Sequence, residues 1–281
     1  SFTFKFQLLQ MKIFKNKKSL INEISGRKKI AFVPTMGALH KGHISLINKA
    51  KKKSNEILVS IYINPKQFNS RKDFNKYPRK LIKDIKILKK IKIKYLYIPT
   101  YKDIYSFNPK NKIYLNNFSK ILCGKFRPHH FKGVLNVVNR FIEIIKPKFI
   151  YLGMKDFQQL SLIKSHVNKK NIKTKIISCP TVREKNGLAI SSRNSKLNNN
   201  HIKSAGKIYK YLKNNKKLIF NKILNRKKSQ ILNKLIALGA TKIDYIECVD
   251  LIDKKICNKS KSNFNIFIAY YLGGIRLIDN L

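Results

Sequence analysis

The stretch Pro34-Thr35-Met36-Gly37-Ala38-Leu39-His40-Lys41-Gly42-His43 decides how this chain folds. It follows an apolar run at 29–33, which predicts a strand, and precedes residues 44–50, whose apolar positions fall on one helical face. The stretch is therefore a strand-to-helix turn with two histidines three residues apart. The free N–H groups at a helix start attract phosphate, and imidazoles there can donate to a phosphate as its charge grows. The combination favours a phosphate-binding turn over two ordinary polar residues at a helix start.

Apolar runs and helical patterns alternate on both sides of this turn. Near-continuous apolar runs predict further strands at 56–64, 95–98, 149–152 and 175–179. Apolar residues at helical spacing predict helices at 20–24, 81–88, 134–145 and 157–167. Such alternation predicts an α/β fold with a doubly wound, mostly parallel, Rossmann-like sheet.

The pattern changes after Pro180. Helical stretches at 201–213 and 226–238 precede apolar, strand-like runs at 243–249, 264–271 and 275–278. We therefore expect two domains, 1–181 and a smaller α+β domain at 182–281. We expect Ser1–Gln10, which precede Met11, to be a dispensable extension. The Lys- and Asn-rich segments 213–217 and 259–263 are interpreted as solvated loops.

The charge of the chain is extreme, with 62 Lys and Arg against 13 Asp and Glu and a net charge of +49. One interpretation is nucleic-acid binding; the other is drift of a whole proteome toward A/T-rich codons, which encode Lys, Ile and Asn. The lysines are spread along the entire chain, which favours drift, so we expect no specific nucleic-acid partner. No apolar run is long enough to span a bilayer, so we expect no membrane partner. The four cysteines lack metal-ligand spacing and indicate reduced thiols of a cytoplasmic protein.

Polar side chains follow two of the predicted strands, where a doubly wound sheet binds its ligands. Asn64 and Gln67 follow the strand at 56–64, and their neutral amides suit a small hydroxy acid. Lys155 and Asp156 follow the strand at 149–152; the first can reach a phosphate, and the second can cap the helix or hold ribose hydroxyls. Gln159 lies one turn further on and can face the same cavity as Gln67. Each group alone also suits an ordinary helix start or loop.

Two more loops carry candidate ligand groups. Residues 190–194, Ile-Ser-Ser-Arg-Asn, follow a loop with Gly187, and their hydroxyls and guanidinium suit a triphosphate. Residues 127–134, Arg-Pro-His-His-Phe-Lys-Gly-Val, place Arg127 and His130 at another loop-to-helix start, although a basic surface loop would explain them equally well.

The H-x-G-H pattern resembles the signature of the nucleotidylyltransferase superfamily, which is related to class I aminoacyl-tRNA synthetases. The loop at 190–194 resembles the second, mobile signature of those relatives. Several longer motifs resemble one family, pantothenate synthetase (pantoate–β-alanine ligase), over nearly the whole chain. They are P-T-M-G-A-L-H-K-G-H, S-I-Y-I-N-P-K-Q-F, Y-P-R (77–79), R-P-H-H-F-K-G-V, G-M-K-D-F-Q-Q-L, V-R-E-K-N-G-L-A-I-S-S-R-N, D-Y-I-E (244–247) and R-L-I-D-N (276–280).

The resemblance implies an ATP-dependent, two-step ligation in the cytoplasm by a homodimer with Mg²⁺. The pantoate carboxylate attacks the α-phosphate of ATP, which gives pantoyl adenylate and pyrophosphate. The amine of β-alanine then attacks the adenylate, which gives pantothenate and AMP.

The resemblance also implies roles for individual residues. The catalytic residues would be His40, His43, Lys155 and Arg193, with the two histidines on the phosphates and His43 as proton donor. ATP would contact Met36, Gly37, Ala38, Leu39, His40, Lys41, Gly42, His43, Gly153, Met154, Lys155, Asp156, Val182, Ile190, Ser191, Ser192 and Arg193. The pantoate and β-alanine sites would involve Gln67, Gln159, Asn64, Arg127, His130 and Tyr77.

The chain departs from the family pattern at three acidic positions. Met154 stands where the family commonly has glutamate, and Cys123 where it often has an acid. Acidic residues near 77–79 are thinned to Asp84. These losses bear on the Mg²⁺ contacts and the rate, and not on the class of reaction.

Two alternatives make different demands on the sequence. A nucleotidylyltransferase of the H-x-G-H type that adenylylates a cofactor precursor would not need the Gln67 and Gln159 pair. An RNA-binding protein that had lost catalysis would need a clustered basic face with aromatic stacking positions, and neither is visible in the sequence.

Overall fold

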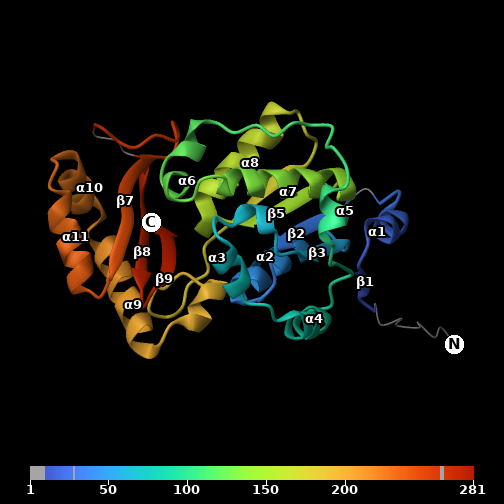
Figure 1. Ribbon diagram of the computed structural model, residues 1–281, viewed down its shortest axis with the longest axis horizontal. Helices are drawn as coiled ribbons and strands as arrows, with labels where there is room; N and C mark the ends of the chain where they lie inside the picture. Colours follow the sequence, from blue (N-terminus) through green and yellow to red (C-terminus); the bar gives the residue numbers. More distant parts are fainter. Residues whose placement is uncertain (1–9, 28, 260–262) are drawn as a thin grey trace.

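The structure, a computed structural model, describes residues 10–27, 29–259 and 263–281. Two sheets lie side by side (Figure 1). The first is parallel, and the second is antiparallel with the order β7-β8-β9. The strands of the first, in spatial order, are β1 (Lys12–Phe14), β4 (Tyr95–Tyr97), β3 (Ile57–Ile61), β2 (Ala31–Thr35), β5 (Phe149–Gly153) and β6 (Lys175–Cys179). The predicted fold class is confirmed.

Helices cover both faces of the parallel sheet, which is why its central strands are almost continuously apolar. Apolar side chains of α1, α7 and α8 pack on one face, around Phe32 and Leu58. Those of α2 and α4 pack on the other face, around Val33 and Val59. The helices of this part of the chain are α1 (Lys17–Ile24), α2 (Lys41–Lys51), α3 (Arg71–Lys76), α4 (Leu81–Lys90), α5 (Tyr101–Tyr105), α6 (Cys123–Phe126), α7 (His130–Ile145) and α8 (Phe157–Lys169).

The order of the strands places a switch point between β2 and β5. The strands that follow β2 in sequence, β3 and β4, extend the sheet to one side, whereas β5 and β6 extend it to the other. The helix after β2 packs on one face and the helix after β5 on the opposite face. A crevice is therefore expected beyond the carboxyl ends of these two strands. The histidine turn follows β2 there, and residues 153–156 follow β5.

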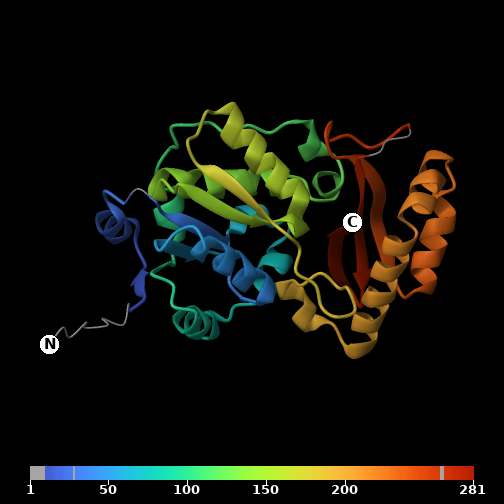
Figure 2. The ribbon, with the colours of Figure 1, turned by 180° about the vertical axis from the view of Figure 1, so that it is seen from behind.

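The antiparallel sheet has its own core. Alternate side chains of β7 (Lys242–Asp250) and β8 (Phe264–Leu272), such as Ile246 and Ile268, pack against three helices, as the period of two in a strand requires. The intervening residues, such as Tyr245 and Phe267, face the parallel sheet's side of the molecule. The remaining elements are α9 (Asn199–Asn214), α10 (Lys216–Leu224), α11 (Lys228–Ala237) and β9 (Ile275–Asn280). Figure 2 shows α10 and α11 on the outer side of this sheet.

The predicted loop at 213–217 is wrong. Apart from Asn215, these residues belong to α9 and α10. Ile219 and Phe220 are buried against the antiparallel sheet, and this packing outweighs the lysines and asparagines that precede them. The predicted loop at 259–263 includes residues 260–262, and the expected extension includes residues 1–9; both sets lie outside the described residues.

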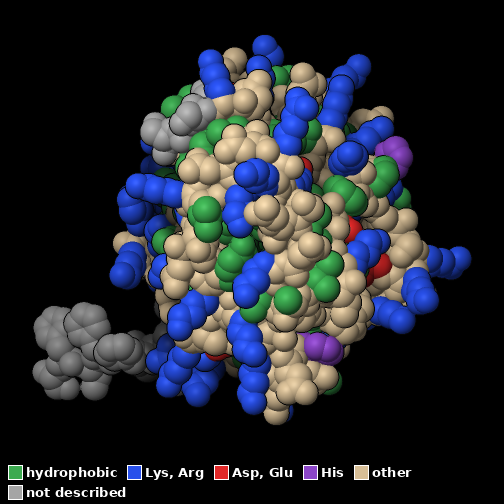
Figure 3. Space-filling view, turned by 90° about the vertical axis from the view of Figure 1, so that its left-hand side faces the viewer, with side chains coloured by type: hydrophobic (Ala, Val, Ile, Leu, Met, Phe, Trp, Pro, Cys, Tyr) green, Lys and Arg blue, Asp and Glu red, His purple; other side chains and the backbone are tan. Residues whose placement is uncertain are grey.

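The basic side chains are dispersed on one face of the molecule. Figure 3 shows the face that carries α10 and α11, where Lys and Arg stand apart from one another and do not gather in one patch. Within the described ranges, no helix combines the length and apolar character needed to cross a bilayer.

Candidate active site

A cavity of about 300 Å³ opens at the carboxyl ends of β2 and β5, between them and the antiparallel sheet. Its wall includes residues from seven separate segments of the chain, within 34–46, 62–77, 127–141, 152–159, 180–193, 205–212 and 270–279. It brings together most of the predicted site residues: Met36, His40, Gly42, His43, Gln67, Tyr77, Arg127, His130, Gly153, Lys155, Asp156, Gln159, Val182, Ile190, Ser191, Ser192 and Arg193.

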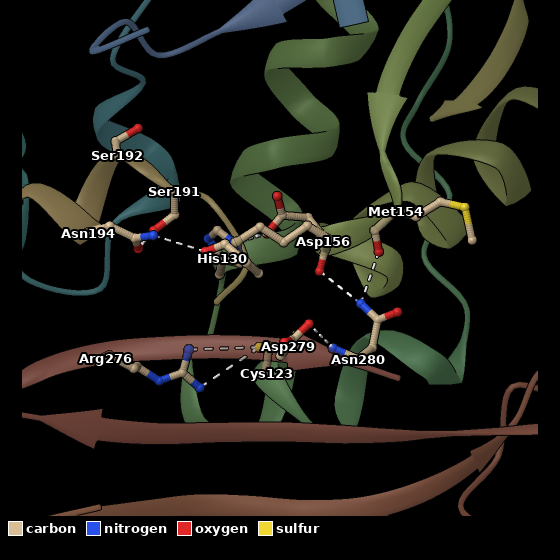
Figure 4. A network of polar contacts seen from close by, with 12 residues as sticks. Cys123, His130, Met154, Asp156, Ser191, Ser192, Asn194, Arg276, Asp279 and Asn280 are labelled. Carbon is tan, nitrogen blue, oxygen red and sulfur yellow. Dashed lines mark hydrogen bonds and ion pairs between the residues drawn. The ribbon is translucent and has the colours of Figure 1, made fainter. Parts of the chain in front are cut away.

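Six predicted residues lie off the cavity wall, namely Gly37, Ala38, Leu39, Lys41, Asn64 and Met154. The first three form the buried bend of the histidine turn. Lys41 is exposed, and Asn64 is 1% exposed and bonded to other protein groups. The side chain of Met154 packs against the large apolar core, and Figure 4 shows it directed away from Ser191 and His130.

The two histidines of the turn cap α2 reciprocally. Nδ1 of His40 accepts a hydrogen bond from the Gly42 N–H at 3.1 Å, and Nδ1 of His43 accepts from the His40 N–H at 3.4 Å. The ring centroids are 4.0 Å apart. Because both Nδ1 atoms accept, we assign the proton of each neutral ring to Nε2. Each ring then offers one N–H donor that the capping contacts leave unused.

Both rings are held neutral at physiological pH. Burial lowers the pKa of His40 to about 4, and the nearby Lys155 ammonium adds to the shift. Burial likewise lowers the pKa of His43 to about 3, with His40 as the next cause. A neutral imidazole with Nε2–H is a hydrogen-bond donor at any pH above these values. The pair thus supplies two fixed donors at the N-terminus of α2, where the helix dipole also favours a phosphate.

A network of amides holds Gln67. Nδ2 of Asn64 donates to the Gly133 carbonyl at 3.1 Å and to Oε1 of Gln67 at 3.3 Å. Oδ1 of Asn64 accepts from the Tyr105 hydroxyl at 2.8 Å. Nε2 of Gln67 donates to the sulfur of Met36 at 2.7 Å. Asn64 is therefore a support for Gln67, and Gln67 itself lines the cavity.

His130 and Arg127 are bonded to each other beside Gln67. Nδ1 of His130 is 2.7 Å from the Gln67 carbonyl and donates to it, so Nε2 accepts from Nη1 of Arg127 at 3.1 Å. Burial lowers the pKa of His130 to about 3, and the Arg127 charge adds to the shift. Burial and then the nearby Arg193 charge lower the pKa of Arg127 to about 10, so the guanidinium is charged at neutral pH.

Two consecutive glutamines on α8 have different roles. Gln158 is buried and holds the loop before α6, because it donates to the Phe118 and Ile121 carbonyls and accepts from the Cys123 N–H. Gln159 is turned about 100° around the helix and lines the cavity with Gln67. The predicted pair of cavity amides is thus brought together.

The antiparallel sheet holds the turn after β5 in place. Nδ2 of Asn280, on β9, donates to the carbonyls of Met154 and Lys155 at 2.9 and 3.0 Å (Figure 4). The ammonium nitrogen of Lys155 is 3.4 Å from Oδ1 of Asp156. Asp279, the neighbour of Asn280, pairs with both Nη atoms of Arg183 at 2.6 and 2.8 Å. The two sheets are therefore tied together at the rim of the cavity.

The loop that carries the two serines crosses from the second sheet toward the first. The Ile190 N–H donates to the Val182 carbonyl at 3.0 Å, which closes the loop. The Tyr77 hydroxyl donates to Oγ of Ser192 at 3.5 Å, and Arg193 pairs with Asp73 of α3 at 3.3 Å. Ser191 instead donates to Oδ1 of Asn194 at 2.6 Å (Figure 4).

Two charged residues of the cavity, Arg276 and Asp279, were missed by the sequence analysis. Arg276 of β9 lines the cavity, pairs with Asp244 at 2.7 Å and places both Nη atoms 3.8 Å from the sulfur of Cys123. The Cys123 sulfur is also 3.0 Å from the Tyr245 hydroxyl. The R-L-I-D-N and D-Y-I-E motifs contained Arg276 and Asp244, but spacing alone gave neither a role.

This chain is similar to known proteins over most of its length. The family described as "Pantoate-beta-alanine ligase" matches residues 10–281. A pantothenate synthetase of Francisella tularensis subsp. novicida is 43% identical over 268 residues, which cover 93% of this chain and 92% of the relative.

Two solved structures are similar as well. One is a pantoate–β-alanine ligase from Francisella tularensis complexed with "Beta-gamma ATP" and β-alanine, with a TM-score of 0.82, 42% identity and coverage of 96% of this chain and 97% of that one. The other, from Thermus thermophilus, has a TM-score of 0.84, 29% identity and coverage of 96% and 99%. This chain therefore belongs to the pantoate–β-alanine ligase family.

Proposed function

We propose that this protein joins pantoate to β-alanine at the expense of ATP and releases AMP and pyrophosphate. The observation that carries the proposal is the meeting, in one cavity, of the two histidine donors, the loop at 190–193 and the Gln67 and Gln159 amides. The Francisella relative complexed with "Beta-gamma ATP" and β-alanine belongs to the same family. We expect ATP on the histidine side of the cavity and pantoate between the two amides.

In the first step, a carboxylate oxygen of pantoate attacks the α-phosphorus of ATP. The bond from that phosphorus to the bridging oxygen breaks, and pyrophosphate leaves. Negative charge grows on the phosphate oxygens, where His40 and His43 donate through Nε2 and Lys155 and Arg193 supply positive charge. Preorganised donors of this kind stabilise the transition state through hydrogen bonds, and we propose this role for His43 in place of the proton transfer that the resemblance implied. The low pKa values of the two rings agree with donors that stay neutral.

In the second step, the amine of β-alanine attacks the carbonyl carbon of the bound pantoyl adenylate. The bond from that carbon to the phosphate oxygen breaks, AMP leaves, and the amine proton passes to solvent. Holding both reactants in the cavity makes the step effectively unimolecular. The guanidiniums of Arg127 and Arg276 are the charged groups that we propose for the carboxylate of β-alanine.

The residues present fit a magnesium ion carried in with ATP. Mg²⁺ takes one or two carboxylates, with phosphate oxygens and water as its other ligands. Asp156 lines the cavity and is 45% exposed, whereas Asp279 is engaged by Arg183. Among the described residues there is no cluster of three or more His, Cys, Asp or Glu that could hold a metal by itself. We propose Asp156 as its protein ligand, and the ion would neutralise phosphate charge.

The proposal extends to the organisation of the protein. We propose domains at 1–181 and 182–281, each built around one of the two sheets, with residues 1–10 dispensable. We also propose a cytoplasmic homodimer, which rests on the family resemblance alone. Sedimentation of the purified protein tests the dimer.

The function is tested by measuring AMP formation from ATP with pantoate and β-alanine together, and with each omitted. AMP should require both, and pantoate alone should release pyrophosphate for about one turnover, because the adenylate stays bound. AMP formation that ignores β-alanine would instead favour a nucleotidylyltransferase that adenylylates a cofactor precursor.

A further inference from the structure

The bend before the two histidines requires a backbone conformation that is unfavourable for most residues. Gly37 and Ala38 both have positive φ angles, +74° and +48°. Glycine adopts this left-handed conformation freely, but a residue with a Cβ such as alanine does not. Ala38 therefore needs contacts from outside the bend to hold it there. The Thr35 hydroxyl supplies one, since it accepts from the Gly37 N–H at 3.1 Å.

Asp84, on the first turn of α4, supplies two further contacts. Its Oδ2 accepts from the Ala38 N–H at 2.7 Å, and its Oδ1 accepts from the Leu39 N–H at 2.8 Å. The side chain is 1% exposed and lies off the cavity wall, so Asp84 has no direct path to a substrate. The next residue after Leu39 is His40, which caps α2. The carboxylate thus fixes the chain immediately before the catalytic donors.

An ionised carboxylate suits these two contacts in a way that an amide cannot. Two adjacent N–H donors need two acceptor atoms, and an asparagine side chain offers one acceptor and one donor group. Burial raises the pKa of Asp84, while the Leu39 and Ala38 N–H groups oppose the shift by bonding to the charged form. Lys80 and Lys83 also favour the charged form.

We propose that Asp84 is a positioning residue, which holds the bend at Ala38 and Leu39 so that the His40 and His43 rings present their Nε2 donors to the phosphates. This inference rests on the proposed ligase function. A positioning role differs from a purely structural one, because the two hydrogen bonds of Asp84 fix the conformation of the bend and do not pack one helix against another. Loss of Asp84 should therefore lower turnover by more than its effect on folding explains.

Asp103 provides a matched control. Its carboxylate also accepts from two backbone N–H groups, those of Lys17 at 2.8 Å and Thr100 at 3.0 Å, but these lie at the starts of α1 and α5 and not in the histidine turn. The experiment compares wild type, Asp84→Asn, Asp84→Glu and Asp103→Asn in AMP formation, thermal unfolding and amide hydrogen exchange. Both asparagine variants should lose thermal stability, and Asp84→Asn should lose more because Asp84 is 1% exposed whereas Asp103 is only partly buried. Only Asp84→Asn should lower kcat, by about 10- to 100-fold, the scale expected for misplaced catalytic groups.

Further measurements distinguish a failure of the role proposed for Asp84 from a failure of the proposed ligase function. The KM for β-alanine should change by less than about twofold, and Ala38 and Leu39 should exchange about tenfold faster or more, as for loss of a hydrogen bond to a charged group. If Asp84→Asn does not fold, Asp84→Glu decides, with a kcat below that of wild type at near-normal stability. A kcat within twofold of wild type in the folded variant, or an equal loss in Asp103→Asn, would overturn the inference. Inactive wild type would count against the ligase function alone, and the exchange rates would still test the contact.

Discussion

Adding one methyl group at Gly133 on α7 should displace the backbone that carries Gln67 in the proposed pantoate site. A Cβ at Gly133 would lie 2.1 Å from the Lys66 carbonyl oxygen and 2.8 Å from the Gln67 Cα. To reach the 3.4 Å of ordinary contact, the backbone at 66–67 must move about 1.3 Å. That backbone carries the Gln67 carbonyl bonded to His130 and the side chain that lines the cavity.

Gly133→Ala should therefore lower kcat/KM for pantoate by about 10²-fold, since a displacement near 1 Å has that effect on positioned groups. The overpacked contact should also cost about 1–3 kcal/mol of stability. The KM for ATP should change little, because the histidine turn lies on other elements. The assay is AMP formation at varied pantoate, with thermal unfolding alongside.

Lys132→Ala is the control for this variant. Lys132 is the exposed neighbour of Gly133 on the same helix, so its truncation leaves the contact with 66–67 unchanged. Its kinetics should match those of wild type. A folded Gly133→Ala enzyme with kcat/KM for pantoate within threefold of wild type would refute the reasoning.

Three other predictions follow from the site and the core. His43→Ala should lower kcat by roughly 10²–10³-fold, the loss expected for one donor to a developing anion, and should cost about 0.5–2 kcal/mol of stability because the cap of α2 is lost; wild-type turnover would rule out its role. Met154→Glu should lower stability by about 1–3 kcal/mol, because it places a carboxylate against the apolar core on which the thioether packs. It should change turnover by less than threefold, because the side chain points away from the cavity; a tenfold gain in kcat would show that the lost glutamate served the chemistry. Burial lowers the pKa of His130 and His166, so on acidification these histidines take up protons in the unfolded chain before they do so in the folded one. The free energy of unfolding should therefore fall as pH drops below about 6.5, by up to about 1.4 kcal/mol per pH unit for each histidine. Denaturant titrations at pH 7.5 and 5 check this, and equal stabilities would contradict it.

Local sequence patterns predicted the parallel sheet and the histidine turn because both depend on nearby residues. The apolar run before Pro34 and the helical face after His43 define a strand and a helix without knowledge of any partner. Polar residues at the ends of strands then meet because parallel strands end at the same edge. Gln67, Gln159 and Lys155 were found in this way, and all three line the cavity.

Long-range contacts were not predictable in the same way. The carboxylate of Asp84 reaches Ala38 across 46 residues, and Arg276 reaches Cys123 across 153. Neither contact leaves a periodic pattern or a characteristic spacing in the sequence, because each depends on how whole helices and strands pack together. Asn64 shows the same limit, because its position after β3 was predicted but its inward rotamer, bonded to Gly133, was not.

Short and weakly patterned elements were also missed. β1 has three residues and, among the residues that the structure describes, pairs with β4 alone, so its pattern is too short to identify. α10 begins in a run of lysine and asparagine that looks like a loop, and it is helical because Ile219 and Phe220 find a sheet to pack against. In both cases the tertiary partner, and not the local composition, decides the structure.

The central claim is that the carboxylate of pantoate attacks the α-phosphorus of ATP and that β-alanine then displaces AMP. The direct measurement is mass spectrometry of AMP formed from pantoate labelled with ¹⁸O in its carboxylate. In the proposed sequence one carboxylate oxygen becomes the bridge of the adenylate and departs with AMP, so each AMP should carry one labelled oxygen. Unlabelled AMP, with all of the label in pantothenate or in pyrophosphate, would contradict the mechanism.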